Sequence, residues 1–239
     1  MRSSSANSVR VEVDASEVES VAMPMARAQI VSLLLIFPFV IVTVVPHWYL
    51  WRIPDENPFP VSLLGAFVAS IVVHEGLHGL GYYWGGADWS EIEFGFNWSG
   101  LAPYAHCSVP LRANSYRLAI ALPGLALGLP PLLAGLGLGS WWLTLYAFLM
   151  LVAAAGDTLL LWIMRGVPDT AWIQDHPSQM GGLVLGHAAS PAAPTLANEE
   201  ITDAPENSED TEARRQLMYL FLITMAAGFA AGFAYAFFG

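Results

Sequence analysis

His74-Glu75-Gly76-Leu77-His78 is the stretch on which the interpretation of this chain depends. Two histidines four residues apart lie on one face of a helix, one turn above each other, so that both imidazoles reach one metal ion. The glutamate between them is rotated to one side, where it is placed to hold and deprotonate a zinc-activated water. The flanking residues, from Val61 to Val73 and from Leu80 to Trp84, are nearly all apolar. Because imidazole and charged side chains are costly inside a membrane, the pattern indicates a functional site within a membrane span.

The composition is that of a membrane protein. Of 239 residues, 55% are hydrophobic and only 12% are charged, whereas a soluble domain carries roughly 25% charged residues. An apolar segment of about 20 residues is long enough to cross about 30 Å of hydrocarbon. We therefore expect an all-α polytopic membrane protein with about five transmembrane helices. These are Ile30–Leu50, Val61–Trp84, Leu118–Leu138, Trp141–Met164 and Leu217–Phe238.

The positions of the arginines predict the orientation of these spans. The chain has nine arginines and no lysine, and eight of them lie in the N-terminal leader or in the segments after the second and fourth spans. Only Arg52 lies in the opposite set of loops. The positive-inside rule therefore predicts an integral membrane protein with a cytoplasmic N-terminus and an outside C-terminus.

Composition also divides the chain into four segments. We expect a polar cytoplasmic leader over residues 1–29 and a membrane-embedded core that carries the metal motif over residues 30–186. Residues 187–216 are acidic and poor in large apolar side chains, which predicts a disordered linker to a C-terminal transmembrane helix over residues 217–239. The net charge of -11 argues against nucleic acid as a partner. The single cysteine, Cys107, excludes an intrachain disulfide.

Two segments between the spans depart from a plain helical pattern. Residues Glu91–Trp98 alternate polar and apolar, Ser99-Gly100 suits a turn, and Leu101–Val109 follows. This predicts a short β-hairpin-like insert between the second and third helices, with an irregular interfacial loop as the alternative. The prolines and glycines of the third span indicate either a bent helix beside a wet cavity or close helix packing through small residues.

A catalytic zinc needs a third protein ligand at the depth of His74 and His78. Asp157 is the only carboxylate besides Glu75 within the predicted spans. The second and fourth spans both run toward the cytoplasm, and at 1.5 Å per residue Asp157 lies about 12 Å from that end. His74 and His78 lie about 15 and 9 Å from the same face, so the depths agree. We therefore predict His74, His78 and Asp157 as the metal ligands.

Other roles remain open at this point. Asp157 has an alternative as a buried carboxylate bonded to a hydroxyl such as that of Thr158. The rival third ligands are Asp88, His106, Cys107 and the pair Asp175-His176. The candidates for a donor to the oxyanion are Asn97, Asn114 and His176.

With these residues in place, the chain resembles the site-2 protease class of intramembrane metalloproteases, and more closely the putative zincin peptidase family of prokaryotic membrane proteins. The resemblance covers about Ser62–Gly186, and it implies Zn²⁺ on His74, His78 and Asp157 with Glu75 as the catalytic carboxylate. The Asn-Pro-x-x-x-Leu-Asp-Gly pattern of typical site-2 proteases is absent. Besides H-E-x-x-H, the resemblance rests on Tyr104-Ala105-His106-Cys107, Leu122-Pro123-Gly124, Gly156-Asp157, and Gln174-Asp175-His176-Pro177 followed by Gly181.

We therefore expect an intramembrane zinc metalloendopeptidase in a prokaryotic cell membrane, with zinc-activated water and Glu75 as general base. It would cleave a membrane-associated protein or peptide in the lipid bilayer near the cytoplasmic face. The substrate would present extended backbone, and Glu91–Trp98 could pair with it as an added strand. A non-proteolytic metal-binding membrane protein or transporter, and an inactive scaffold that retains the motif, remain as alternatives.

Overall fold

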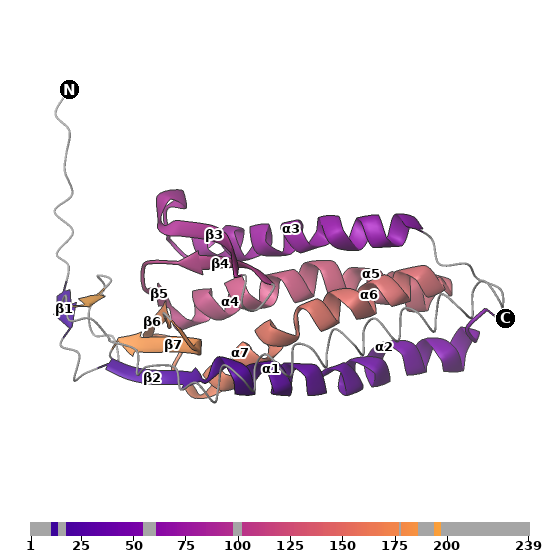
Figure 1. Cartoon of the computed structure of the whole chain (residues 1–239), viewed down its shortest axis with the longest axis horizontal. Helices are drawn as coiled ribbons and strands as arrows, with labels where there is room; N and C mark the ends of the chain where they lie inside the picture. Colours follow the sequence, from indigo (N-terminus) through magenta and orange to yellow (C-terminus); the bar gives the residue numbers. More distant parts are fainter. Residues whose placement is uncertain are drawn as a thin grey trace, which may run out of the picture. The chain divides into compact units, whose positions relative to one another are not determined.

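The computed structural model describes residues 11–13, 18–54, 61–97, 102–176, 178–185 and 194–196. The chain forms helices and small sheets (Figure 1). They divide into two compact units. The first unit comprises Met1–Met23, Val72–Pro123 and Asp157–Thr202. Of the described residues, the second comprises those within Pro24–Ile71 and Gly124–Gly156. All four predicted site residues therefore belong to the first unit.

The elements follow one another along the chain as helices with interspersed short strands. The helices are α1 (Met25–Leu34), α2 (Ile36–Trp51), α3 (Val61–Trp84), α4 (Ala113–Pro123), α5 (Leu129–Leu138), α6 (Trp141–Ala153) and α7 (Ala155–Ile163). Short 3₁₀ turns occur at Trp89–Glu91 and Met164–Gly166, and the π-helical turn Gly124–Gly128 joins α4 to α5. The strands are β1 (Val11–Val13), β2 (Val18–Met23), β3 (Ile92–Asn97), β4 (Ala102–Cys107), β5 (Leu111–Arg112), β6 (Trp172–Asp175), β7 (Met180–Leu185) and β8 (Pro194–Leu196).

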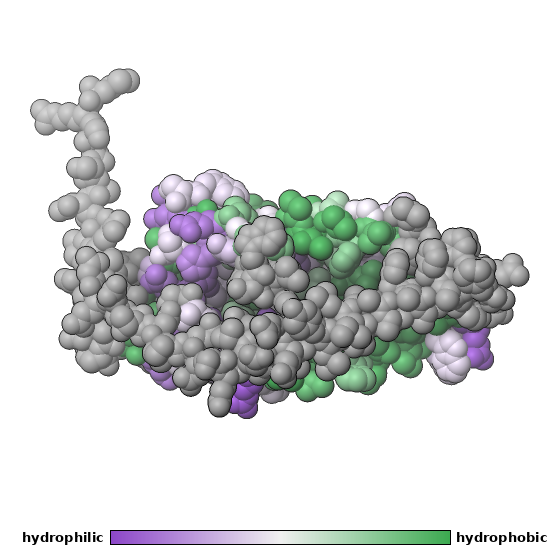
Figure 2. Space-filling model, viewed as in Figure 1, coloured by the Kyte–Doolittle hydropathy of each residue, from purple (hydrophilic) through white to green (hydrophobic). Residues whose placement is uncertain are grey.

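Three helical segments are long and apolar enough to cross a membrane, namely Met25–Trp51, Ser62–Trp84 and Ala113–Leu138. A fourth results if α6 and the segment Ala155–Gly166 count as one span. On the face seen in Figure 2, hydrophobic residues gather along α3 and hydrophilic residues around β3 and β4. Four of the five predicted spans thus have helical counterparts, and the fifth, Leu217–Phe238, lies outside the described residues.

The fourth predicted span is not one straight helix. The segment Trp141–Met164 is divided into α6 and α7, which are bent by 48° at Ala154. Ala154 leaves helical geometry, with φ -84° and ψ 15°. Apolar periodicity does not reveal such a bend, because both halves keep the same composition. Because the helix is interrupted at Ala154, Asp157 lies in the first turn of α7.

The expected all-α class is too narrow, because the first unit also contains a four-stranded sheet in the order β2-β7-β6-β5. All of its pairings are antiparallel, and β2 comes from the segment interpreted as a polar leader. Short apolar runs such as Met180–Leu185 fit a buried strand and a buried helix equally well. A parallel pair, β1 with β8, joins Val11–Val13 to Pro194–Leu196, which lies within the predicted linker.

The predicted hairpin is confirmed as the antiparallel pair β3–β4, with Ile92 opposite Cys107 and Asn97 opposite Ala102. The predicted turn Ser99-Gly100 lies outside the described residues. The N–H of Ser108 donates to the Glu91 carbonyl, just before the first pair of the two strands. Hydrogen-bonded pairs alternate along an antiparallel ladder, so the next ones are Glu93 with His106 and Gly95 with Tyr104. The N–H groups of Ala105 and Cys107 therefore point to the outer edge of β4, away from β3.

In the second unit, α2, α5 and α6 pack side by side (Figure 1). Polar side chains bond across the helices of this unit: His47 Nδ1 lies 2.9 Å from Thr144 Oγ1, and Ser70 Oγ lies 2.6 Å from the Tyr146 hydroxyl. A Cβ on Gly135 would lie 2.5 Å from Thr144 Oγ1. These contacts favour the small-residue packing alternative for this part of the third predicted span.

In the first unit, α3 and α4 approach each other closely at a glycine. A Cβ on Gly81 would lie 2.4 Å from Ala119 Cα, and a Cβ on Gly85 would lie 3.2 Å from Ser115 Cβ. Gly81 lies in the last turn of α3 and Gly85 directly follows the helix, four residues later, while Ala119 and Ser115 are one turn apart on α4. The small side chains let the two backbones touch, which brings the Ala119 carbonyl within reach of His78.

We predict that Gly81→Ala destabilises the protein, because the new methyl group has no space against α4. Overpacking of this kind costs about 1–3 kcal/mol. Gly76→Ala is the matched control, since a Cβ at Gly76 meets nothing within 4 Å. The control is expected to be neutral or up to about 1 kcal/mol more stable, because alanine favours the helix. Thermal unfolding in detergent micelles measures both, and equal stability of the two variants would contradict the packing described.

Candidate metal centre

His74 and His78 of α3 face Asp157 of α7 within the first unit. Both histidines are buried, each with 6% of its surface exposed. His74 Nε2 lies 3.1 Å from Asp157 Oδ2, and His78 Nε2 lies 3.4 Å from Asp157 Oδ1. The two Nε2 atoms lie 3.2 Å from each other. Among the described residues, these three form the one group of at least three His, Cys, Asp or Glu whose donor atoms all lie within 4.8 Å of one another.

The neighbours of this group orient its donor atoms. His78 Nδ1 lies 3.0 Å from the backbone carbonyl oxygen of Ala119. A carbonyl oxygen only accepts, so Nδ1 carries the proton and the lone pair of a neutral imidazole is on Nε2. Asp157, in the first turn of α7, lies where backbone N–H groups and the helix dipole favour a negative charge. The Nε2 lone pair of His78 and the carboxylate oxygens of Asp157 are therefore oriented toward the space between the two side chains.

The donor set and its spacing fit a zinc ion. Tetrahedral ligands at 2.0–2.1 Å from zinc lie about 3.3 Å apart. The two Nε2 atoms are 3.2 Å apart, and each lies 3.1 or 3.4 Å from a different oxygen of the Asp157 carboxylate, which is close to that spacing. No well-aligned hydrogen-bond donor reaches Asp157 Oδ2, although the atom is buried and His74 Nε2 is near. If one imidazole donates its Nε2 proton to the other, Asp157 Oδ2 still receives no hydrogen bond. A cation between the three side chains would instead interact with both Nε2 atoms and with the carboxylate. His, His and Asp are also ligands that zinc accepts.

Glu75 is half-buried and faces a different neighbour from the two histidines. Successive helix residues are rotated by about 100°, so Glu75 and Gly79 share a face of α3 that His74 and His78 do not. The backbone amide of Ala105 in β4 lies within hydrogen-bonding range of the Glu75 carboxylate. A Cβ on Gly79 would lie 2.5 Å from the ring of Phe94 in β3. The hairpin therefore covers the glutamate side of the motif.

Most of the rival ligands lie in a second polar cluster. Asp175 Oδ2 lies 3.1 Å from His106 Nδ1 and accepts the N–H of Cys107 at 3.0 Å. Asp175 Oδ1 accepts the hydroxyl of Tyr116. The hydrogen bond to Asp175 raises the pKa of His106, and burial raises the pKa of the Cys107 thiol to about 11. A protonated thiol is a poor metal ligand, and His106 and Asp175 already satisfy each other.

The remaining candidates serve local structure. Asp88 begins the 3₁₀ turn Trp89–Glu91 with a reciprocal capping arrangement, in which its N–H donates to the Glu91 carboxylate at 2.9 Å. His176 Nδ1 accepts the N–H groups of Ser178 and Gln179 at 3.2 and 3.0 Å. Asn114 Oδ1 accepts the N–H of Ser115 at 2.8 Å. All of these contacts are local, between residues at most three positions apart in the chain. The side chain of the other candidate, Asn97, lies outside the part that the structure describes.

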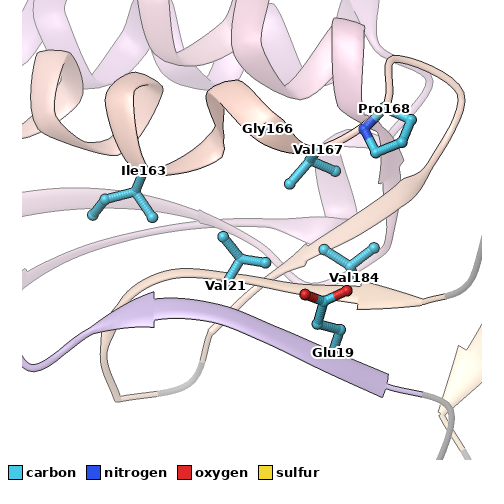
Figure 3. A pocket seen from close by; sticks show the side chains of 7 residues that line it. All are labelled: Glu19, Val21, Ile163, Gly166, Val167, Pro168 and Val184. Atoms are coloured by element: carbon cyan, nitrogen blue, oxygen red, sulfur yellow. The ribbon is translucent and has the colours of Figure 1, made fainter.

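The first unit also contains an open pocket of about 350 Å³ (Figure 3). It lies between β2, β7 and the end of α7. The side chains that line it are apolar apart from the carboxylate of Glu19, and none of the predicted site residues is among them. With no group of convergent polar side chains, this pocket offers no alternative centre for the chemistry. The lining residues are Glu19, Val21, Ile163, Gly166, Val167, Pro168 and Val184.

Comparison with known proteins agrees with the metal motif. The model of the family described as "Putative zincin peptidase" matches residues 67–172. The matched segment runs from α3 into β6 and contains His74, Glu75, His78 and Asp157. No curated protein matches the chain, and no solved structure matches it. Over its central segment, the chain is therefore similar to the putative zincin peptidase family, whose name denotes zinc-dependent cleavage of peptide bonds.

Proposed function

We propose that the protein is an intramembrane zinc metalloendopeptidase, in which His74, His78 and Asp157 hold zinc and Glu75 is the general base. The observation that carries the proposal is the convergence of His74, His78 and Asp157, each of which offers a donor atom within 4.8 Å of the donor atoms of the other two. The similarity to the zincin family supports peptide bonds as the target. The likeness to the site-2 protease class rests on the motif and the later Gly156-Asp157, and it supports cleavage within the membrane.

Glu75 is placed for proton transfer. Zinc at this centre supplies a Lewis acid that polarises a peptide carbonyl and activates water. The Glu75 carboxylate, one position along the helix from His74, takes the proton of the attacking water and delivers it to the leaving amine. The Ala105 amide lies within hydrogen-bonding range of this carboxylate and is placed to orient it. His78, fixed through Ala119, and Asp157, at the start of α7, keep the ligand side of α3 in place.

The substrate we propose is a membrane-associated protein cleaved near the cytoplasmic face of a prokaryotic cell membrane. The arginine distribution supports this orientation. A helical substrate hides its carbonyls in its own hydrogen bonds, so the cleaved segment must be extended. Within the described residues, β3 pairs only with β4. The alternation of the hairpin turns the N–H of Phe94 to the outer edge of β3, where an added strand could pair with it.

Zinc content and cleavage test the proposal together. Purified protein is expected to contain one zinc per chain by elemental analysis, and His74→Ala is expected to lose it because two ligands do not suffice. Glu75→Gln is expected to keep the zinc and to lose cleavage of fluorescein-labelled unfolded casein by at least about 10²-fold, the usual contribution of a general base.

The matched control for that experiment is Glu19→Gln, the same chemical change at an exposed position of β2, which is expected to keep both properties. Wild-type protein without zinc would refute the proposal. Zinc without any cleavage would favour the inactive scaffold, and cleavage that survives Glu75→Gln would remove Glu75 from its role.

Strand addition at β3 has its own test. Phe94→Pro removes an outward N–H without breaking a hydrogen bond to β4, whereas Phe94→Ala keeps the N–H and removes the same aromatic ring. We expect a higher KM for casein with Phe94→Pro than with Phe94→Ala, because only proline removes a hydrogen bond to the added strand. Equal KM values for the two variants would show that the substrate does not pair there.

A further inference from the structure

Asp175 is a buried carboxylate that the proposed chemistry does not use. Its side chain is 13% exposed and lies at the end of β6. Two donors from β4 share its Oδ2, namely the Cys107 N–H at 3.0 Å and His106 Nδ1 at 3.1 Å. Its Oδ1 accepts the hydroxyl of Tyr116 from α4, a side chain that is almost wholly buried. One carboxylate thus joins three elements of the first unit.

Along β4, this contact is coupled to Glu75. The N–H groups of Cys107 and Ala105 point to the same outer edge, two residues or about 6.7 Å apart. The Cys107 amide donates to Asp175, and the Ala105 amide lies within hydrogen-bonding range of the Glu75 carboxylate. A strand has little freedom to slide between two such neighbouring bonds. Holding Cys107 on Asp175 therefore sets the position of the Ala105 amide.

Along α4, the same carboxylate is coupled to His78. Tyr116 lies three residues, or about one turn, before Ala119, whose carbonyl oxygen is 3.0 Å from His78 Nδ1. The ring of Tyr116 also lies 6.1 Å from that of Tyr82, one turn after His78 on α3. Asp175 therefore contacts both elements that support the centre, namely β4 beside Glu75 and α4 beside His78.

We propose that Asp175 is a positioning residue for Glu75, acting through the Cys107 and Ala105 amides of β4. Its three donors offset the cost of burying a carboxylate, so that β4 keeps one position against α3 and α4. Without Asp175, the edge of β4 is released and Glu75 loses its amide partner. The catalytic consequence rests on the proposed peptidase function, whereas the structural consequence does not.

Carboxyl footprinting tests the structural consequence without any cleavage assay. The zinc-loaded protein is treated with a water-soluble carbodiimide and glycine ethyl ester, and the labelling of Glu75 is measured by mass spectrometry. We expect Asp175→Ala to raise labelling of Glu75 several-fold with zinc retained, and Asp175→Asn, which keeps one acceptor oxygen, to raise it less. Asp169→Ala is the control, because the Asp169 side chain is 78% exposed and pairs with Arg117; it is expected to leave labelling unchanged.

The kinetic readout separates positioning from general damage. In Asp175→Ala, we expect kcat for casein to fall about 10–100-fold with KM unchanged, the usual effect of removing a group that orients a catalytic side chain.

If Asp175→Ala loses zinc, Tyr116→Phe tests the inference instead, because it removes only one hydroxyl group. This variant is expected to retain zinc and still raise the labelling of Glu75. Unchanged Glu75 labelling in a zinc-retaining variant, or a change in KM alone, would overturn the inference. Raised labelling in a protein whose wild type cleaves nothing would refute the peptidase function and leave the positioning intact.

Discussion

Polar side chains within a membrane span must find their partners inside the protein, and this constraint shapes both units. In the second unit, His47 meets Thr144 and Ser70 meets Tyr146. In the first unit, His74 and His78 of the motif converge with Asp157 on one small space, and the three offer donor atoms within 4.8 Å of one another. The hydrogen bonds of the second unit hold helices together, whereas the three side chains of the first unit form a group that could hold a metal ion.

The two faces of α3 divide the work that we propose for the centre. The face with His74 and His78 meets α4 and α7, where Ala119 and Asp157 set the direction of the imidazoles. The adjacent face with Glu75 meets the hairpin. The contacts of the histidines depend on the close approach of α3 and α4 at Gly81. The contact of Glu75 depends on the packing of β4 against α3. Asp175 touches both the hairpin and α4, so the two conditions are linked.

Much of this arrangement follows from local patterns. Apolar length predicts the helical spans, alternation predicts β3 and β4, and the i, i+4 spacing predicts that His74 and His78 share a face. The depths of residues along the second and fourth spans predict Asp157 as a neighbour of the histidines. In the structure, its Oδ2 lies 3.1 Å from His74 Nε2. Its role as a ligand stays a prediction that zinc analysis tests. The sequence does not predict the bend at Ala154, because the composition changes little there. It does not predict the pairing of β2 with β7 either, because the two strands are far apart in sequence.

The amino-acid sequence by itself determines the apolar segments and the metal motif, and it predicts Asp157 as the third ligand, since all three depend on residue type and on spacing along the chain. Only the tertiary structure decides which backbone groups support the site. The carbonyl of Ala119 and the amide of Ala105 belong to the main chain, which every residue carries, so no side-chain pattern marks them. Likewise, His106 and Asp175 suggest a metal ligand by type, but the fold pairs them with each other, because β4 and β6 are brought together from distant parts of the chain.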